Sequence, residues 1–363
     1  MGSDCMYFCY KDNTEVINNS KKYEFNQNKT NIHINNNNSN NNNKNKSMLI
    51  EHIKLQEKNK YDEFQKNLSL KLPKIGKLIT KEQFHEKIPE NISTHSNMNK
   101  FQIMNNIVIN KDTFELQPVE LKNGDIYEGS WDENIEMDGK GKYYIEEEKL
   151  FFEGVWDKGK LIYGRIYYPN NNIYEGYISD FNCHGKGKLI YVNGDIYEGE
   201  FSQGDFKGYG IMKWSIDKIL ITYEGEFSRK CLNNYGKLIC NYGEQYEGNF
   251  KDNLFNGKGK FTFIDGSTYE GDFEYGKKNG KGIYIKKDDF SYEGSWLNDF
   301  AHGLWSFTKD NIIIRGLWRN GINAEIFSKE GEQTNDFNND ILNFNVPNIS
   351  LLLPDRLPHL GSK

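Results

Sequence analysis

The residues of this chain that could do chemistry recur in short strings and do not gather in one place. A Tyr-Glu-Gly triplet occurs seven times, and its glutamates could be interpreted as paired carboxylates for acid–base chemistry. The lysine- and glycine-rich string at residues 256–260 resembles a phosphate-binding loop. Cys183, His184 and His302 are residue types that bind metal ions.

None of these strings brings the remaining parts of a site with it. Acid–base carboxylates need different environments that separate their pKa values, whereas each glutamate here lies in the same pattern beside lysines. The string at 256–260 lacks the GxxxxGK[ST] pattern and a following helix. No two further ligands accompany Cys183 and His184 or His302. We therefore expect no catalytic residue, no cofactor and no metal site, and the chain is not expected to be an enzyme.

The spacing of the triplet identifies an internal repeat. Copies aligned on the aromatic residue, from Tyr127 through Phe152 to a degenerate copy at Ile314, follow one another at intervals of 22 to 26 residues. A Gly-x-Gly string follows most aromatic residues by eleven or twelve positions. A near-constant step of this size marks a repeat array, and each unit is expected to hold two short strands joined by turns such as Asn193-Gly194.

Alternation along each strand predicts two chemically different faces. Tyr127, Gly129 and Trp131 point to one side, and Glu128 points to the other. Since glycine in a strand marks the close approach of another group, we expect aromatic rings of one unit to lie over the bare backbone of the next. The opposite face is expected to pair glutamates with lysines across strands. The predicted repeat-face residues, structural or binding, are Tyr127, Gly129, Trp131, Tyr174, Tyr197, Phe201, Tyr223, Phe227, Tyr246, Phe250, Tyr269, Phe273, Tyr292 and Trp296.

These residues resemble the MORN (membrane occupation and recognition nexus) repeat, most clearly in the copies that begin at Tyr246 and Tyr269. The resemblance implies an all-β fold, an elongated single-layer antiparallel sheet of stacked hairpins, over residues 121–326 as eight repeats and a degenerate ninth. It also implies a scaffold near membranes or the cytoskeleton. Family members are described as phospholipid-associated, and some dimerise. Protein partners, a possible phospholipid ligand and a possible homodimer are therefore expected.

Composition narrows the setting of the protein. The formal net charge of −6 gives no electrostatic footprint for nucleic acid, so no nucleic-acid partner is expected. The five cysteines are an odd number without a CxxC pair, which indicates a reducing compartment. No apolar run is long enough to span a membrane. We expect a cytoplasmic protein at a peripheral membrane or at the cortical cytoskeleton.

The segment before the repeats is expected to attach and extend the array. Residues 1–16 resemble an acylated anchor, with Gly2 as a myristoylation site and Cys5 and Cys9 as palmitoylation sites, although Met6 departs from the motif. Two acyl chains would hold the protein stably, whereas one holds it only marginally. Residues 17–47 are rich in asparagine and are expected to form a disordered tether.

Two further flanking segments carry weaker patterns. Residues 48–120 are expected to be helix and linker, with an amphipathic helix over 48–70 and a second helix that starts at a capping box on Thr80 and stops at Pro89. The helix over 48–70 either docks on its own protein or binds a partner. Residues 327–363 are expected to be a tail that caps the array or docks a partner, through Leu351, Leu352, Leu353 and Leu357.

The function predicted from the sequence is a non-enzymatic scaffold that assembles protein partners at a membrane or the membrane-linked cytoskeleton. One alternative is a phospholipid-binding module that uses the repeat face directly. Acidic residues outnumber basic ones from residue 121 onward, which weakens this alternative because anionic headgroups attract clustered basic residues. A second alternative is the regulatory subunit of a separate enzyme.

Overall fold

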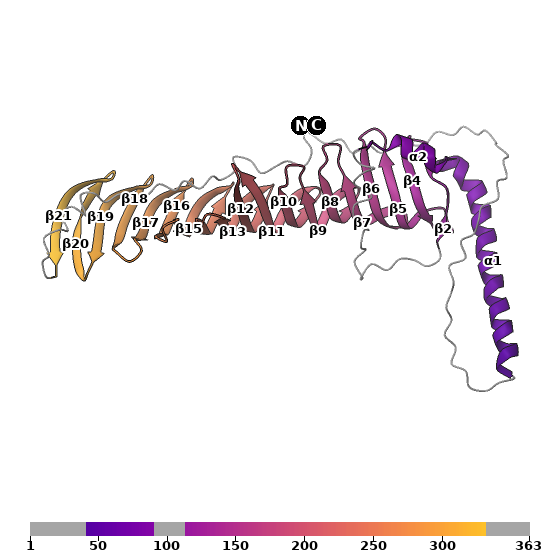
Figure 1. Ribbon diagram of the computed structural model, residues 1–363, viewed down its shortest axis with the longest axis horizontal. Helices are drawn as coiled ribbons and strands as arrows, with labels where there is room; N and C mark the ends of the chain where they lie inside the picture. The colour runs from indigo at the N-terminus through magenta and orange to yellow at the C-terminus, as the bar shows by residue number, and fades with distance from the viewer. Residues whose placement is uncertain (1–40, 91–112, 332–363) are drawn as a thin grey trace. The chain divides into compact units, whose positions relative to one another are not determined.

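The structure is a computed structural model that describes residues 41–90 and 113–331 (Figure 1). They form two compact units. The N-terminal unit holds the described residues up to 149 together with 155–160, and the C-terminal unit holds 150–154 and the residues from 161 onward. The predicted acylation sites Gly2, Cys5 and Cys9 and the predicted docking leucines Leu351, Leu352, Leu353 and Leu357 lie outside the described residues.

The predicted fold class is confirmed: the described residues are mostly β, with 21 strands in one antiparallel sheet. Helix α1 spans Asn41–Ile75 and helix α2 spans Lys81–Lys87. The early strands are β1 Gly76–Leu78, β2 Phe114–Glu115, β3 Val119–Leu121, β4 Ile126–Trp131, β5 Met137–Ile145, β6 Leu150–Asp157 and β7 Lys160–Tyr167. The later strands are β8 Ile173–Ser179, β9 Asn182–Ile190, β10 Ile196–Ser202, β11 Asp205–Ile216, β12 Ile219–Ser228, β13 Cys231–Cys240, β14 Gln245–Lys251, β15 Leu254–Thr262, β16 Thr268–Glu274, β17 Lys277–Ile285, β18 Ser291–Leu297, β19 Phe300–Lys309, β20 Ile312–Arg319 and β21 Ile322–Glu330.

Helix α1 is longer than the helix predicted over 48–70. It begins at Asn41, so residues 41–47, expected to belong to a disordered tract, form its first turns instead. Its C-terminal half is anchored: Phe64 is buried and stacks on Phe114 with ring centroids 4.0 Å apart, and Leu68 is also buried. Once packing has nucleated this half, each further residue adds a hydrogen bond at low cost, which explains the extension into polar sequence.

The capping box predicted at Thr80 is confirmed. The Thr80 hydroxyl accepts a bond from the Gln83 amide at 3.2 Å, and the Gln83 side chain accepts one from the Thr80 amide at 2.9 Å. Helix α2 then ends at Lys87, before Pro89, with Phe84 fully buried. Beside it, β1 pairs with β3, and β3 pairs with β4 of the first repeat. The segment expected to be helix and linker therefore also adds strands to the sheet.

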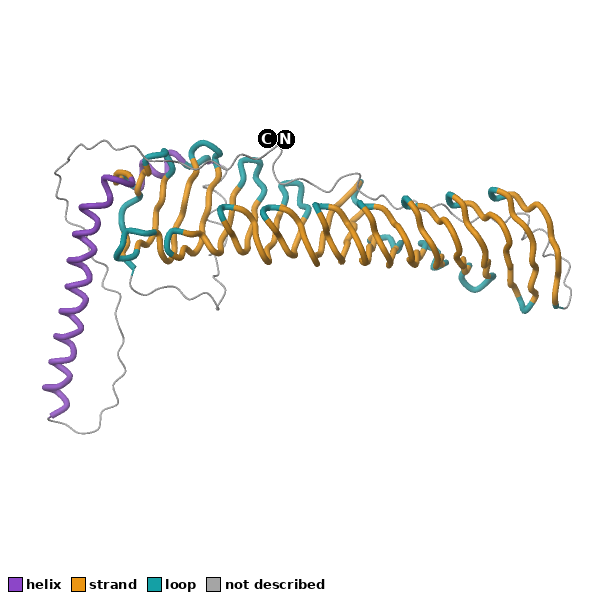
Figure 2. Tube along the Cα trace, turned by 180° about the vertical axis from the view of Figure 1, so that it is seen from behind, coloured by secondary structure: helices purple, strands orange, loops and turns teal. Residues whose placement is uncertain are grey.

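The C-terminal unit repeats one hairpin (Figures 1 and 2). In β14 and β15 the register places Tyr246 opposite Phe261 and Gly248 opposite Gly259, followed by a bulge. Tight turns close the hairpins, and the two residues at a tip have positive φ, as at Asp252 (49°). Positive φ at both central positions is the signature of the turn that matches the twist of antiparallel strands.

The aromatic and glycine positions pack within each hairpin. A Cβ atom added to Gly259 would lie 2.3 Å from the Tyr246 hydroxyl, so the Tyr246 ring covers the bare backbone of its own hairpin. The expectation that rings cover the next unit is therefore wrong for the tyrosines of the triplets; it holds at Gly316, where an added Cβ would lie 2.7 Å from the Trp305 ring of the preceding unit. Contact between repeats comes instead from the second aromatic residue: Phe273 meets the Tyr246 ring edge-on, with centroids 5.1 Å apart. Strand alternation defines the face of a ring but not the strand that it covers.

Candidate binding surface

The predicted repeat-face residues form the core of the array. Their aromatic side chains are between 0% and 4% exposed. In six of the seven triplets the tyrosine hydroxyl also donates a hydrogen bond to a backbone carbonyl three residues further on, as in Tyr246, which donates to the Asn249 carbonyl at 2.9 Å. Burial raises the pKa of Tyr246, so the phenol stays neutral. A partner that approaches the sheet therefore meets the opposite, polar face.

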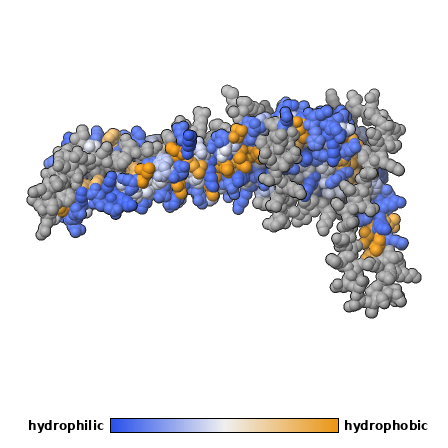
Figure 3. Space-filling model, in the orientation of Figure 1, coloured by the Kyte–Doolittle hydropathy of each residue, from blue (hydrophilic) through white to orange (hydrophobic). Residues whose placement is uncertain are grey.

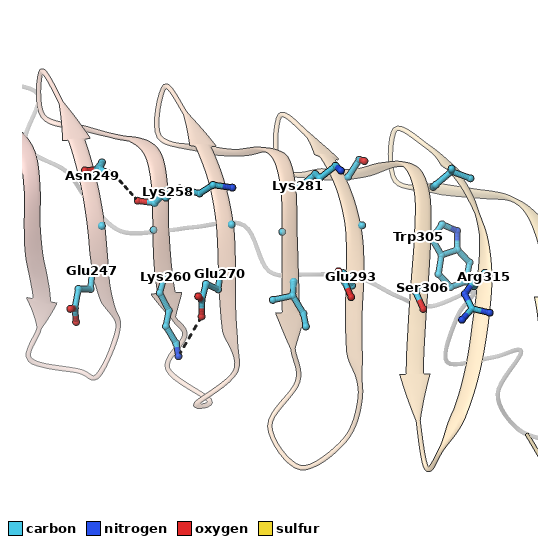
Figure 4. A pocket seen from close by; sticks show the side chains of 18 of the residues that line it. Glu247, Asn249, Lys258, Lys260, Glu270, Lys281, Glu293, Trp305, Ser306 and Arg315 are labelled. Carbon is cyan, nitrogen blue, oxygen red and sulfur yellow. Dashed lines mark hydrogen bonds and ion pairs between the residues drawn. The ribbon is translucent and has the colours of Figure 1, made fainter. Parts of the chain in front are cut away.

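An open groove of about 1260 Å³ runs along this polar face, over strands β13 to β20 (Figure 4). Its floor is backbone, because side chains in the central row of each strand would point to the core on the other side of the sheet, and glycines fill most of this row. These glycines are Gly248, Gly259, Gly271, Gly282 and Gly294. Glycine is required at these positions by the core on the other side: a Cβ added to Gly282 would lie 2.4 Å from the Tyr269 hydroxyl.

Two rows of side chains form the walls of the groove. Residues on either side of a glycine in a strand point to the same face, so each strand contributes one residue to each wall. The first wall, here called the glutamate wall, contains Glu247, Lys260, Glu270, Ile283, Glu293, Ser306 and Arg315. The second wall, here called the lysine wall, contains Asn249, Lys258, Lys281, Ser295 and Leu304.

The pairing of glutamate with lysine predicted for this face is present. Glu270 lies opposite Lys260 in the register, with an ion pair of 3.8 Å, and Lys258 pairs with Asp272 at 2.7 Å. These groups are largely exposed to solvent, so each pair contributes only about 0.2–1 kcal/mol. A ligand can therefore replace these ion pairs with its own contacts at a small cost in free energy.

Glu293 differs from the other glutamates of the groove. Its neighbours in the register are Ile283 on one side and Ser306 on the other, where Glu247 and Glu270 have a lysine. Within the part of the chain that the structure describes, the Glu293 carboxylate forms neither an ion pair nor a hydrogen bond. It is therefore available to a cation from outside.

Two tyrosines close the polar face at one end of the groove. Tyr235 comes from the lysine-wall position and donates to Glu247 at 2.8 Å, so its side chain bridges the two walls. Tyr209 and Glu224 form the same bridge in the preceding repeat, at 2.5 Å. Beyond Tyr235 the same position holds lysine or leucine, and there the groove is open. This feature was not predicted, although its signal, a tyrosine directly before the glycine at Gly210 and Gly236, is visible in the sequence.

The metal-binding residue types do not cluster in the part of the chain that the structure describes. No group of three or more acidic, histidine or cysteine side chains within residues 41–90 and 113–331 could hold a metal ion. Burial raises the pKa of the Cys183 thiol to about 12, so it is not a thiolate ligand or nucleophile at neutral pH.

Neither helix of the described chain has the length and apolar character of a membrane span. On the face shown in Figure 3, hydrophobic residues lie between hydrophilic ones.

Comparison with known proteins gives a family signal over the same region. The model of the MORN repeat matches residues 127–146, 174–196, 197–216, 246–268, 269–289 and 292–304. These are six of the eight predicted copies; the copies at Phe152 and Tyr223 are not matched. In the Tyr223 copy, Gly225 still lies opposite Gly236, as the repeat register requires. No curated protein matches the chain.

Solved structures give only distant similarity. The TCP domain of SAS-4 (dCPAP) of Drosophila melanogaster, solved with a proline-rich motif of Ana2 (dSTIL), is 12% identical, with 47% of this chain and 84% of that chain covered and a TM-score of 0.27. The G-box domain of the microcephaly protein CPAP is 11% identical, with 60% and 86% covered and a TM-score of 0.17. Similarity at this level carries no information on function.

Proposed function

Because the chain is a MORN repeat protein, with six repeats across residues 127–304, we propose that its sheet is a non-enzymatic scaffold that binds protein partners along the polar groove. The observation that carries the proposal is the glycine floor between the glutamate wall and the lysine wall. The floor leaves backbone accessible over strands β13 to β20, and its walls offer charged groups at regular intervals. Such a surface suits an extended segment of a partner protein.

The mixture of acidic and basic side chains in the groove suits a protein better than a phospholipid surface. Anionic headgroups attract clusters of basic residues, whereas the glutamate wall places Glu247, Glu270 and Glu293 beside the basic groups. We place the scaffold at a membrane or at the membrane-linked cytoskeleton. Acyl chains on Gly2, Cys5 and Cys9 would attach it there, and the groove would remain free for proteins.

A variant that closes the groove tests the proposal. Tyrosine at Lys258 and Lys281 would bridge the walls as Tyr235 does, so the double variant Lys258→Tyr/Lys281→Tyr should fill the floor without disturbing the core. Lys186→Tyr places the same residue type at the same repeat position outside the groove and is the matched control.

The readout is proximity labelling of neighbours in cells. We expect a set of proteins that wild type and Lys186→Tyr label and the groove-closed variant does not. Purified members of that set should then bind the wild-type protein directly and bind the closed variant at least about ten-fold more weakly, a loss of about 1.4 kcal/mol. Identical labelling by all three proteins would mean that partners do not use the groove.

A further inference from the structure

The groove has a repeat distance that selects among backbone conformations of a bound segment. Each repeat contributes two strands, and neighbouring strands lie about 4.8 Å apart, so equivalent wall residues recur about every 9.6 Å. Glu247, Glu270 and Glu293 are such equivalents, each 23 residues after the previous one. A segment that lies along the groove fits well only if its own side chains return to one side at the same interval.

The polyproline II helix meets this condition. It has three residues per turn and a rise of about 3.1 Å, so every third side chain returns to the same side after about 9.3 Å. A β-strand returns every two residues, after about 6.8 Å, and falls out of step within one repeat. Seven residues of an α-helix cover about 10.5 Å, and the side chain has then rotated by about 20°. Over three repeats the mismatch is about 1 Å for polyproline II and about 3 Å for the α-helix.

The width and floor of the groove favour the same conformation. The two walls are two residues apart along each strand, about 6.8 Å, which is narrower than an α-helix with its side chains at 10–12 Å. A polyproline II segment is slender and leaves its own backbone carbonyls unpaired. The glycine floor lets such a segment approach the backbone closely. Tyr235, which is 56% exposed at the end of the groove, adds an aromatic surface of the kind on which proline rings pack.

The carboxylates of the groove all lie in the glutamate wall, which also holds Lys260 and Arg315, whereas the lysine wall holds Lys258 and Lys281. A basic side chain of a bound segment therefore finds its counter-charges on the glutamate side. The three glutamates recur once per repeat, and Glu293 has no lysine or arginine directly opposite it in the register. We infer that the groove takes a segment of a partner protein in the polyproline II conformation, with a basic side chain at every third position beside the glutamate wall. The inference rests on the proposed function, because it names the class of segment that the scaffold would bind.

The test uses the full-length protein and fluorescein-labelled peptides in anisotropy titrations. The first probe is five repeats of Pro-Pro-Arg. The second has the same composition with its arginines at uneven spacing, and the third replaces every arginine by glutamate. We expect the first peptide to bind at least about five-fold more tightly than the second, a difference of about 1 kcal/mol. The third should bind most weakly.

Variants locate the binding. Lys281→Tyr should abolish the preference for the regular peptide, since a tyrosine there can bridge to Glu293 as Tyr235 bridges to Glu247. Glu293→Gln should weaken the regular peptide, and Glu198→Gln, outside the groove, should not. Thermal unfolding of each variant verifies that it is folded. Equal binding of the regular and uneven peptides, or regular binding that Lys281→Tyr leaves intact, overturns the inference. If neither arginine peptide binds while proximity labelling still depends on the groove, the inference fails and the scaffold function stands.

Discussion

The Nζ atom of Lys278 lies 3.6 Å from Oδ1 of Asp299, and the Lys278 side chain is fully buried. The ammonium also lies 5.5–5.9 Å from the ring centroids of Phe263, Tyr269 and Trp296. A cation is thus held in the aromatic core of the array, where other repeats place an apolar residue. Two charges in such a site have lost most of their hydration, and their mutual attraction offsets that cost only in part.

An earlier repeat shows how the same position is filled without charge. There the amide of Leu232 donates to Asn253 Oδ1 at 2.7 Å, as the amide of Lys278 donates to Asp299 Oδ1 at 2.9 Å. The double variant Lys278→Leu/Asp299→Asn copies this neutral pair, and we expect it to raise the free energy of unfolding by about 1–4 kcal/mol. Asp299→Asn alone should lower it by about 3 kcal/mol or more, because it leaves a buried cation without its counter-charge. Urea unfolding of the three proteins measures both changes, and a double variant less stable than wild type would contradict this account.

The same lysine makes stability depend on pH in the alkaline range. Burial lowers the pKa of Lys278 from 10.5 to about 8 in the folded protein, despite the opposing effect of Asp299. Between these values the unfolded chain binds more protons than the folded one, so stability contributed by this site rises from pH 8 toward pH 10.5, by about 3 kcal/mol in total. Other groups titrate in this range, so the quantity to measure is the difference between wild type and Lys278→Leu/Asp299→Asn. That difference should shrink as the pH rises, and a constant difference would exclude a titrating Lys278.

The sequence was sufficient for the features that repeat. A step near 23 residues and strict alternation along each strand define the array, its two faces and the pairing of glutamate with lysine. It did not reveal the role of each glycine. The first glycine of the string, such as Gly257 with φ of 84°, bends the strand, whereas Gly259 makes room for the Tyr246 ring. The two positions therefore require glycine for different physical reasons. The sequence alone does not distinguish these reasons, because they follow from the register between neighbouring strands.

The groove and the docked helix could not be predicted because they depend on packing between segments. The position that holds Lys258 and Lys281 holds Tyr235 in an earlier repeat, and the consequence, a bridge to Glu247, requires the cross-strand register. The apolar residues of α1 predicted a helix but not the surface that it covers. The contact with Phe114 depends on a residue that belongs to no repeat.

The glycines under the tyrosine rings should be among the least replaceable residues of the array. In Gly259→Ala the new methyl group would lie 2.3 Å from the Tyr246 hydroxyl, so the ring or the strand has to move. We expect a loss of about 3 kcal/mol or more in the free energy of unfolding, as for other overpacked cores. Gly194→Asn is the control, because a side chain at Gly194 meets nothing within 4 Å and asparagine tolerates its φ of 90° better than most residues. A loss in Gly259→Ala no larger than that in Gly194→Asn would mean that the contact with the Tyr246 ring adds little to the cost.

The two halves of α1 should respond differently to truncation of apolar side chains. Phe64 is 1% exposed and stacks on Phe114, so Phe64→Ala should cost about 3–5 kcal/mol in the stability of the N-terminal unit. Leu55 is 56% exposed, and Leu55→Ala should leave stability nearly unchanged. Hydrogen exchange of the α1 amides, with thermal unfolding, measures both effects. Rapid exchange over the Phe64 turn in the wild type would show that the helix does not dock in solution.

Attachment to a membrane should depend on acylation and not on the repeats. Gly2→Ala removes the N-terminal glycine that myristoylation requires, and Cys5→Ala/Cys9→Ala removes the thiols for palmitoylation. Since a single acyl chain binds membranes only marginally, either change should move most of the protein from the membrane fraction of its own cells to the cytosol. The groove-closed variant Lys258→Tyr/Lys281→Tyr is the control and should stay with the membrane. The reverse pattern, in which acylation variants remain bound and the groove-closed variant is released, would assign membrane attachment to a partner held in the groove.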